Sequence, residues 1–290
     1  MSTVERPWRA LMAIPVALGA LVGSLVALAI ATAIRSAAVD NPVHQDGLAG
    51  VAAHGDPPLV TILGTFGQDL ALVAGVLIVV TMASQGRAWA AALGLRAPAR
   101  PLQAALLVVA GYLVFLLVAQ VWTSALDIAD RENVPVKLGT RDSTGALIGA
   151  AFLVCTVAPL AEELFFRGFV FGALRRYGLA IAALVTGVLF GLVHVSSSPI
   201  GFIVPLGVLG VLLCLLYERT GSLYPSIALH CVNNSIAFGV GDGRLWLIPF
   251  VLVGSAVLLT ALLAAVRRLG SSRSGRLGAL EATDEVPAVP

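Results

Sequence analysis

Charged residues are scarce in this sequence. Only 12% of its 290 residues are Asp, Glu, Lys or Arg, whereas 58% are hydrophobic and the mean hydropathy is +0.95. A soluble domain carries roughly twice that charged fraction. The composition therefore excludes an ordinary soluble domain and predicts an integral membrane protein that sits in a lipid bilayer. Because the net charge is only +2, no nucleic-acid partner is expected.

Several common motifs are also missing. The three cysteines, Cys155, Cys214 and Cys231, all lie inside apolar stretches, so a disulfide framework is not expected. The sequence has no CxxC pair, no Cys/His zinc spacing and no HExxH motif, and it lacks heptads, tandem repeats and a phosphate-binding loop. We therefore expect no cofactor and no metal. Zinc stays an alternative because a glutamate and two histidines could bind it.

What the sequence has instead is a series of apolar runs, most of them near the 20 or so residues that a helix needs to cross about 30 Å of hydrocarbon. They predict an all-α polytopic membrane protein with about eight transmembrane helices. The first run is too long for the core of a signal peptide, so we interpret it as a retained span. The expected spans are residues 10–34, 59–84, 102–125, 145–172, 180–196, 199–217, 222–240 and 245–268.

The distribution of basic residues predicts the orientation of this chain in the membrane. With the N-terminus in the cytoplasm, twelve of the 18 Lys and Arg residues fall in inner segments and five in outer segments, and Arg167 lies within the membrane. The positive-inside rule favours this arrangement, which also places the C-terminus in the cytoplasm. We expect a multi-pass protein of the cell (plasma) membrane.

Polar chemistry is distributed unevenly along the chain. The first three expected spans contain almost no ionisable residue except Asp69, which we expect to pair with a neighbouring helix. Nearly all other intramembrane polar residues lie in the last five spans, which suggests a catalytic or binding core in helices four to seven. The expected organisation is an N-terminal transmembrane scaffold at 1–143, a core with the last span at 144–269, and a disordered cytoplasmic tail at 270–290.

Two adjacent glutamates, Glu162 and Glu163, lie in one of the most apolar stretches. An ionised carboxylate in hydrocarbon costs several kcal/mol, so such groups are paired, hydrated or functional. On a helix, Glu163 and Arg167 are i,i+4 neighbours in the favourable acid-first order, whereas Glu162 points about 100° away. The pattern predicts that Arg167 neutralises Glu163 and leaves Glu162 for chemistry.

Two further i,i+4 pairs occur on later spans, Phe190 with His194 and His230 with Asn234. Taken singly, each could be a hydrogen-bonded or helix-packing feature, because buried polar pairs also join transmembrane helices. With Glu162 they supply a carboxylate, two imidazoles and an amide. A carboxylate and an imidazole can activate a water molecule. A second imidazole and an amide can stabilise an oxyanion, by about 3–4 kcal/mol for one donor. The set predicts hydrolysis of a peptide bond without a metal or a covalent nucleophile.

The three motifs together resemble the signature of the CPBP family of intramembrane glutamic endopeptidases, also called the CAAX protease, ABI or Rce1-like family. The resemblance covers about residues 145–240, and the motifs agree in order, internal spacing and placement on successive spans. They are Glu162-Glu163-x-x-x-Arg167, Phe190-x-x-x-His194 and His230-x-x-x-Asn234.

This resemblance implies an eight-helix fold with a conical cavity that opens to the cytoplasmic side. It also implies roles for the motif residues. Glu162 and His194 would activate the attacking water, and His230 and Asn234 would form the oxyanion hole. The other three motif residues, Glu163, Arg167 and Phe190, would support this site.

Other functions stay open at this point. Family members also serve in bacteriocin immunity or as scaffolds, so a non-catalytic membrane protein is one alternative. A proton-coupled transporter is another, because intramembrane Glu and His residues can relay protons. The main prediction is an enzyme whose partner is a peptide or membrane-protein substrate.

Overall fold

The computed structural model describes most of the chain after the first expected span. The described residues are 58–83, 89–128, 138, 140–141, 143–195, 198–261 and 264–265. The expected span at 10–34 and the expected disordered tail at 270–290 lie outside these residues.

Helices account for nearly all of the described chain, and it contains no strand. The helices before the glutamate pair are α3 (Pro58–Ala83), α4 (Trp89–Ala92), α5 (Pro101–Ala125), α7 (Thr144–Phe152) and the π-helical stretch η1 (Leu153–Val157). Those that follow are α8 (Ala158–Glu163), π-helical η2 (Leu164–Phe171), α9 (Gly172–Leu174), 3₁₀-helical η3 (Arg175–Tyr177), α10 (Leu179–Leu192), 3₁₀-helical η4 (Ile200–Phe202), α11 (Ile203–Thr220), α12 (Leu223–Asp242) and a last helix, Leu247–Ala261. The predicted all-α, polytopic membrane fold is confirmed.

Four helical segments are long and apolar enough to cross a membrane: Ile62–Thr81, Pro101–Ala125, Thr144–Tyr177 and Ile200–Thr220. Two other apolar helices, Leu179–Leu192 and Leu247–Ala261, are shorter. The 14 residues of α10 reach only about 21 Å, less than the roughly 30 Å of hydrocarbon. The protein is a multi-pass membrane protein, and the count of eight spans stays a prediction.

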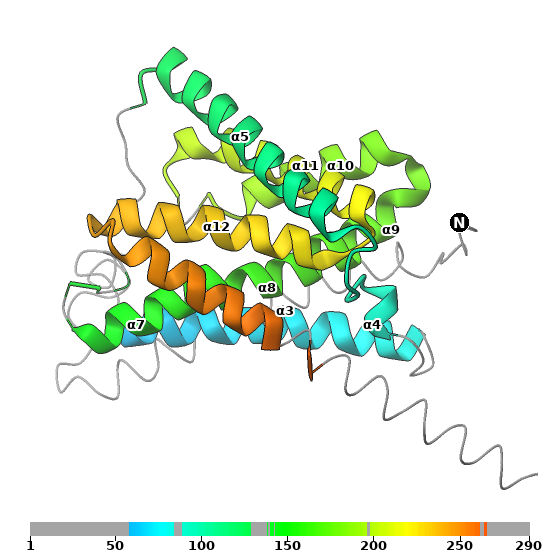
Figure 1. The fold of residues 1–290 in the computed structure, drawn as a ribbon, viewed down its shortest axis with the longest axis horizontal. Helices are drawn as coiled ribbons and strands as arrows, with labels where there is room; N and C mark the ends of the chain where they lie inside the picture. Colours follow the sequence, from blue (N-terminus) through cyan, green and yellow to red (C-terminus); the bar gives the residue numbers. More distant parts are fainter. Residues whose placement is uncertain are drawn as a thin grey trace, which may run out of the picture.

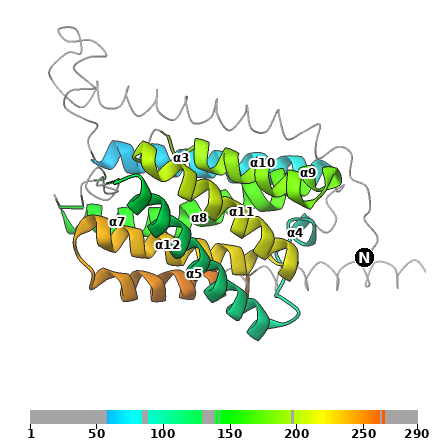
Figure 2. The same cartoon turned by 90° about the horizontal axis from the view of Figure 1, so that it is seen from above.

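The long helix from Thr144 to Tyr177 runs through the middle of the fold. Its central part, α8, lies between α3 on one side and α12 on the other (Figures 1 and 2). Helix α5 crosses over α11 and α12, and α10 packs along α11. The two glutamates at the end of α8 are therefore surrounded by helices that are distant in sequence.

This central helix is not regular. The π-helical stretches η1 and η2 flank α8 directly. Pro159 lies in the first turn of α8. Proline lacks an N–H and its ring clashes with the carbonyl four residues earlier, so the regular hydrogen-bond ladder cannot pass through it. We attribute η1 to this break, and π-helical turns of this kind recur at functional sites.

Candidate active site

The two adjacent glutamates face different surroundings. The Glu163 side chain is fully buried, whereas the Glu162 side chain is 19% exposed. The rotation of about 100° between successive helical residues separates them, as their spacing predicted. One carboxylate thus lies inside the protein, and its neighbour lies at the edge of the interior.

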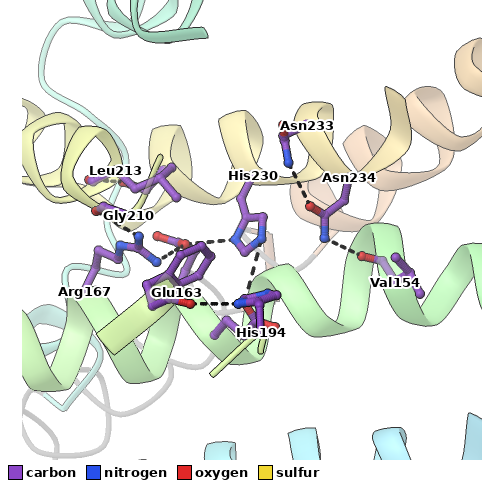
Figure 3. Close-up of polar contacts among 12 residues, drawn as sticks. Val154, Glu163, Arg167, His194, Gly210, Leu213, His230, Asn233 and Asn234 are labelled. Carbon is purple, nitrogen blue, oxygen red and sulfur yellow. Dashed lines mark hydrogen bonds and ion pairs between the residues drawn. The ribbon is translucent and has the colours of Figure 1, made fainter. Parts of the chain in front are cut away.

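Glu163 belongs to a buried ionic network, shown in Figure 3. Nη1 of Arg167 donates to Oε1 of Glu163 at 2.6 Å, and Nη2 of Arg167 donates to the backbone oxygen of Gly210 on α11 at 3.0 Å. The guanidinium carbon also lies 4.6 Å from the ring centre of Phe190. The i,i+4 pair expected from the sequence is therefore present, and it joins the central helix to α10 and α11.

His230 of α12 points into the same network. Its Nδ1 lies 3.0 Å from Oε1 of Glu163 and its Nε2 lies 3.8 Å from Oε2 of Glu162. A carboxylate oxygen only accepts hydrogen bonds, so Nδ1 of His230 carries the hydrogen. The contact between Glu163 and His230 was not expected from the sequence, because the i,i+4 spacing accounted for Glu163 through Arg167 alone.

His194 approaches Glu162 from another side. It follows the end of α10, and its Nδ1 lies 2.7 Å from the backbone oxygen of Phe190. Because a carbonyl oxygen only accepts, Nδ1 carries the hydrogen, and Nε2 of the neutral ring is an acceptor. This Nε2 lies 4.0 Å from Oε2 of Glu162. Glu162, His194 and His230 therefore meet, from three separate helical segments.

The distances around Oε2 of Glu162 have a consequence for its chemistry. At 3.8 and 4.0 Å, the two imidazole nitrogens are beyond direct hydrogen-bond range. Oε2 has no hydrogen-bond partner within the part of the chain that is described. Polar atoms at this separation suit a bridging water. Here the bridged atoms would be a carboxylate oxygen and two imidazole nitrogens.

Phe190 holds the aromatic and cationic groups of the site together. Its ring is fully buried and lies 5.0 Å from the His194 ring, 5.4 Å from the His230 ring and 5.2 Å from the Phe166 ring, between centres. The contacts to His230 and Phe166 are edge-on, a favourable geometry for aromatic pairs. Phe190 therefore fixes both imidazoles and, through its face, the guanidinium of Arg167.

Asn234 lies one helical turn beyond His230 (Figure 3). Its Nδ2 donates to the backbone oxygen of Val154 in η1 at 2.9 Å, and its Oδ1 accepts from Nδ2 of Asn233 at 3.2 Å. Of the two hydrogens on Nδ2 of Asn234, one stays available. Asn233, the preceding residue of α12, therefore orients the amide of Asn234.

Close packing between α10 and α11 positions Phe190 and His194, and sequence analysis did not identify it. A Cβ added at Gly187 would lie 2.7 Å from the backbone oxygen of Gly207, and one at Gly191 would lie 2.6 Å from the backbone oxygen of Ile203. Only glycine allows the two backbones to approach this closely. The Gly187-x-x-x-Gly191 spacing is the signal that could have revealed the contact, because small residues four apart are typical of close transmembrane helix pairs.

The described residues contain no group of three or more His, Cys, Asp or Glu side chains arranged to hold a metal ion. The three cysteines are buried and unpaired with one another. Whether the protein requires zinc is therefore a question for a direct test with a chelator.

Comparison with known proteins identifies the same part of the chain. Residues 144–236, which contain all three motifs, match the family model "Type II CAAX prenyl endopeptidase Rce1-like". A relative from Lactococcus lactis subsp. lactis, "UPF0177 protein YxdF", is 28% identical over 104 residues, which are 35% of this chain and 56% of that protein. The chain thus spans little more than half the length of this curated relative. No solved structure matches. The resemblance indicated by the three motifs is therefore confirmed over this segment, and residues 144–236 are similar to the Rce1-like type II CAAX prenyl endopeptidases.

Proposed function

We propose that this protein is an intramembrane endopeptidase that needs no metal and hydrolyses a peptide bond with a water activated by Glu162 and His194. One observation carries the proposal. Oε2 of Glu162, on a side chain that is 19% exposed, faces Nε2 of His194 at 4.0 Å and Nε2 of His230 at 3.8 Å. Two imidazoles and a carboxylate that converge on one point suit water activation by general-base chemistry.

In the proposed reaction, the water donates one hydrogen to Oε2 of Glu162 and the other to Nε2 of His194. Its free lone pair then attacks the carbonyl carbon of the substrate, and Glu162 takes up the proton as the new C–O bond forms. The carbonyl oxygen becomes an oxyanion. When the C–N bond breaks, the protonated Glu162 returns its proton to the leaving amine, so that one water and one peptide bond become an acid and an amine.

The oxyanion needs hydrogen-bond donors, and His230 and Asn234 are the proposed ones. The remaining Nδ2 hydrogen of Asn234 can donate directly. His230 can donate from Nε2 only as an imidazolium, because its Nδ1 hydrogen is directed at Glu163. An imidazolium here is balanced, since Glu162, Glu163, Arg167 and His230 then carry two negative and two positive charges.

The proposed substrate is a peptide or a membrane protein that enters the bilayer from the cytoplasmic side. The matched family is named for prenylated substrates, and a C-terminal prenylated peptide is one form that such a substrate could take. The proposed location is the plasma membrane with both termini in the cytoplasm, as the distribution of basic residues favours.

The test uses the full-length protein and the substitution Glu162→Gln. Gln has the same shape as Glu but cannot accept the proton, so hydrolysis should fall by about 10²–10⁴-fold, the usual contribution of a general base. The measurements are mass-spectrometric profiles of membrane peptides from cells that produce either form, and cleavage of quenched fluorescent peptides, farnesylated or not, by the purified proteins.

Two controls define this result. The variant should keep the wild-type melting temperature in detergent, because Glu162 is partly exposed and makes no direct hydrogen bond through Oε2. Cleavage should also persist in the presence of a metal chelator. Equal peptide profiles from wild-type and variant cells would instead favour a non-catalytic scaffold, and loss of cleavage with the chelator would favour a metalloprotease.

A further inference from the structure

Helix α3 carries one buried carboxyl group that the site described so far does not use. Asp69 is 3% exposed, and it is the one ionisable residue of α3. It precedes the three buried positions of α3, Leu72, Val76 and Val80, at helical spacings of three, seven and eleven residues. These spacings place all four side chains on one face of the helix.

This face of α3 packs on the central helix. Leu72, Val76 and Val80 belong to the same core cluster as Phe165 and Phe169 of η2. Helix α3 also contacts α8, which carries Glu162 and Glu163. Because Asp69 continues the buried face by one turn, its carboxyl group is directed toward the central helix and not toward lipid.

Because α3 packs directly on α8, Glu162 is the ionisable group of the neighbouring elements whose charge acts on the buried Asp69 carboxyl group. The other ionisable groups on the elements packed against α3 are engaged elsewhere. Glu163 and Arg167 pair with each other, and the Cys155 thiol is buried in another core cluster. No cation of the described chain therefore neutralises Asp69.

Both carboxyl groups have an unsatisfied oxygen. Oδ2 of Asp69 and Oε2 of Glu162 are buried atoms without a hydrogen-bond partner among the described residues. Two carboxylates cannot satisfy each other, because each only accepts hydrogen bonds. A single proton on one of them changes this, since the protonated group becomes a donor.

We propose that Asp69 is a positioning residue of the reaction centre, which holds a proton and donates it in a hydrogen bond to Glu162, either directly or through one water. This inference rests on the proposed function and adds to it a residue from outside the segment that matches the family. The neutral Asp69 leaves the charge balance of Glu162, Glu163, Arg167 and His230 intact. A hydrogen bond donated to a carboxylate favours its charged form, which is the form that accepts a proton from water in the proposed reaction.

The test compares Asp69→Asn with Asp69→Leu in the full-length protein. The amide of Asn imitates the protonated carboxyl group, because it too can donate, and should keep kcat within about threefold of wild type. Leu has a similar size but no donor. It should lower kcat by about 10- to 100-fold, the range that corresponds to one lost hydrogen bond in a buried site. KM should change little, because Asp69 does not touch the substrate.

Control measurements separate this role from a structural one. Asp69→Leu should be at least as stable as wild type in detergent, since it replaces an unsatisfied buried polar group by an apolar one. The neighbouring exposed residue provides a matched control, and Gln68→Leu should leave kcat unchanged. Wild-type kcat in Asp69→Leu, or an equal loss in Asp69→Asn and Asp69→Leu, would overturn the proposal.

A measurement that does not depend on activity keeps the inference separate from the proposed function. Infrared spectra should show the carbonyl band of a protonated carboxylic acid in wild type and in Glu162→Gln, and this band should be absent in Asp69→Asn. An unchanged band in Asp69→Asn would contradict the proton on Asp69. If Glu162→Gln cleaves as well as wild type, the proposed function fails, whatever the infrared result.

Discussion

Glu162 and Glu163 are consecutive residues with the same side chain, yet they lie in two different regions of the site. The Glu163 side chain is fully buried and accepts hydrogen bonds from Arg167 and His230. The Glu162 side chain is 19% exposed, and the nearest nitrogens of His194 and His230 stay 3.8 Å or more from its Oε2. Oε1 of the inner carboxylate accepts two hydrogen bonds, whereas Oε2 of the outer one has no partner among the described residues.

The difference shows how two consecutive residues of one helix can bring the same side chain into two different surroundings. The 100° rotation between neighbours directs one glutamate to the arginine one turn further along and the other to the two histidines. His230 touches both regions, because its Nδ1 faces Glu163 and its Nε2 faces Glu162. The buried pair therefore orients the His230 ring, whose other nitrogen faces Glu162.

The largest effect on stability should follow from removing one partner of the buried Glu163–Arg167 ion pair. Arg167→Met removes the cation and leaves Glu163 buried with only His230 as partner. Removing one partner of a buried ion pair costs about 3–5 kcal/mol, so we expect a large fall in the melting temperature in detergent. Glu162→Gln is the matched comparison and should melt like wild type.

The double variant Arg167→Met/Glu163→Gln sharpens this comparison. It removes both charges together, so it should be more stable than Arg167→Met alone, and the double-mutant cycle should give a large coupling energy. Equal melting temperatures for wild type and Arg167→Met would show that the buried pair does not stabilise the fold.

Much of this arrangement was predictable from local spacing. The observed helices α3, α5, α11 and α12 begin and end within about four residues of the predicted spans, because long apolar runs and flanking Gly, Pro or charged residues define them. The Glu163–Arg167 pair followed from its i,i+4 spacing. The polar motifs also indicated which spans carry the site, since intramembrane charges are costly and therefore informative.

The parts that were not predicted depend on contacts between distant segments. The π-helical stretches around α8, the contact of His230 with Glu163, and the short helix α4 have no periodic signal of their own. Asp69 was expected to pair with a neighbouring helix, but only the packing of α3 against α8 relates it to Glu162. Helical periodicity gives the face on which a residue lies but not the helix that this face meets.

A smaller effect on stability should follow from a substitution in α10 that disturbs the surroundings of Glu162. Gly191→Ala places a methyl group 2.6 Å from the backbone oxygen of Ile203, and backbone cannot move aside cheaply. Overpacking of this kind costs about 1–3 kcal/mol. Peptide cleavage should also fall, because Phe190 and His194 lie at the end of α10 and would move with it.

The matched control for this change is Gly254→Ala in the last helix. An added Cβ there meets nothing within 4 Å, and the residue is exposed. Alanine is favoured over glycine in a helix by roughly 0.5–1 kcal/mol, so this variant should be neutral or slightly stabilised. If both alanine variants behave alike, the close approach of α10 and α11 does not position Phe190 and His194.

The smallest effect is expected at a second ion pair that begins on the same long helix. Arg175 and Glu218 form a bidentate pair like many buried ones, but their side chains are 38% and 30% exposed. Exposed pairs contribute only about 0.2–1 kcal/mol and are screened by salt. Arg175→Gln should therefore lower the melting temperature slightly, and the difference from wild type should shrink as salt is raised.

The fall in melting temperature in Arg167→Met should not respond to salt, because the Glu163 carboxylate lies where ions do not reach. A salt-dependent loss in Arg167→Met would mean that solvent enters the inner region, and the distinction between the two glutamates would then lose its physical basis.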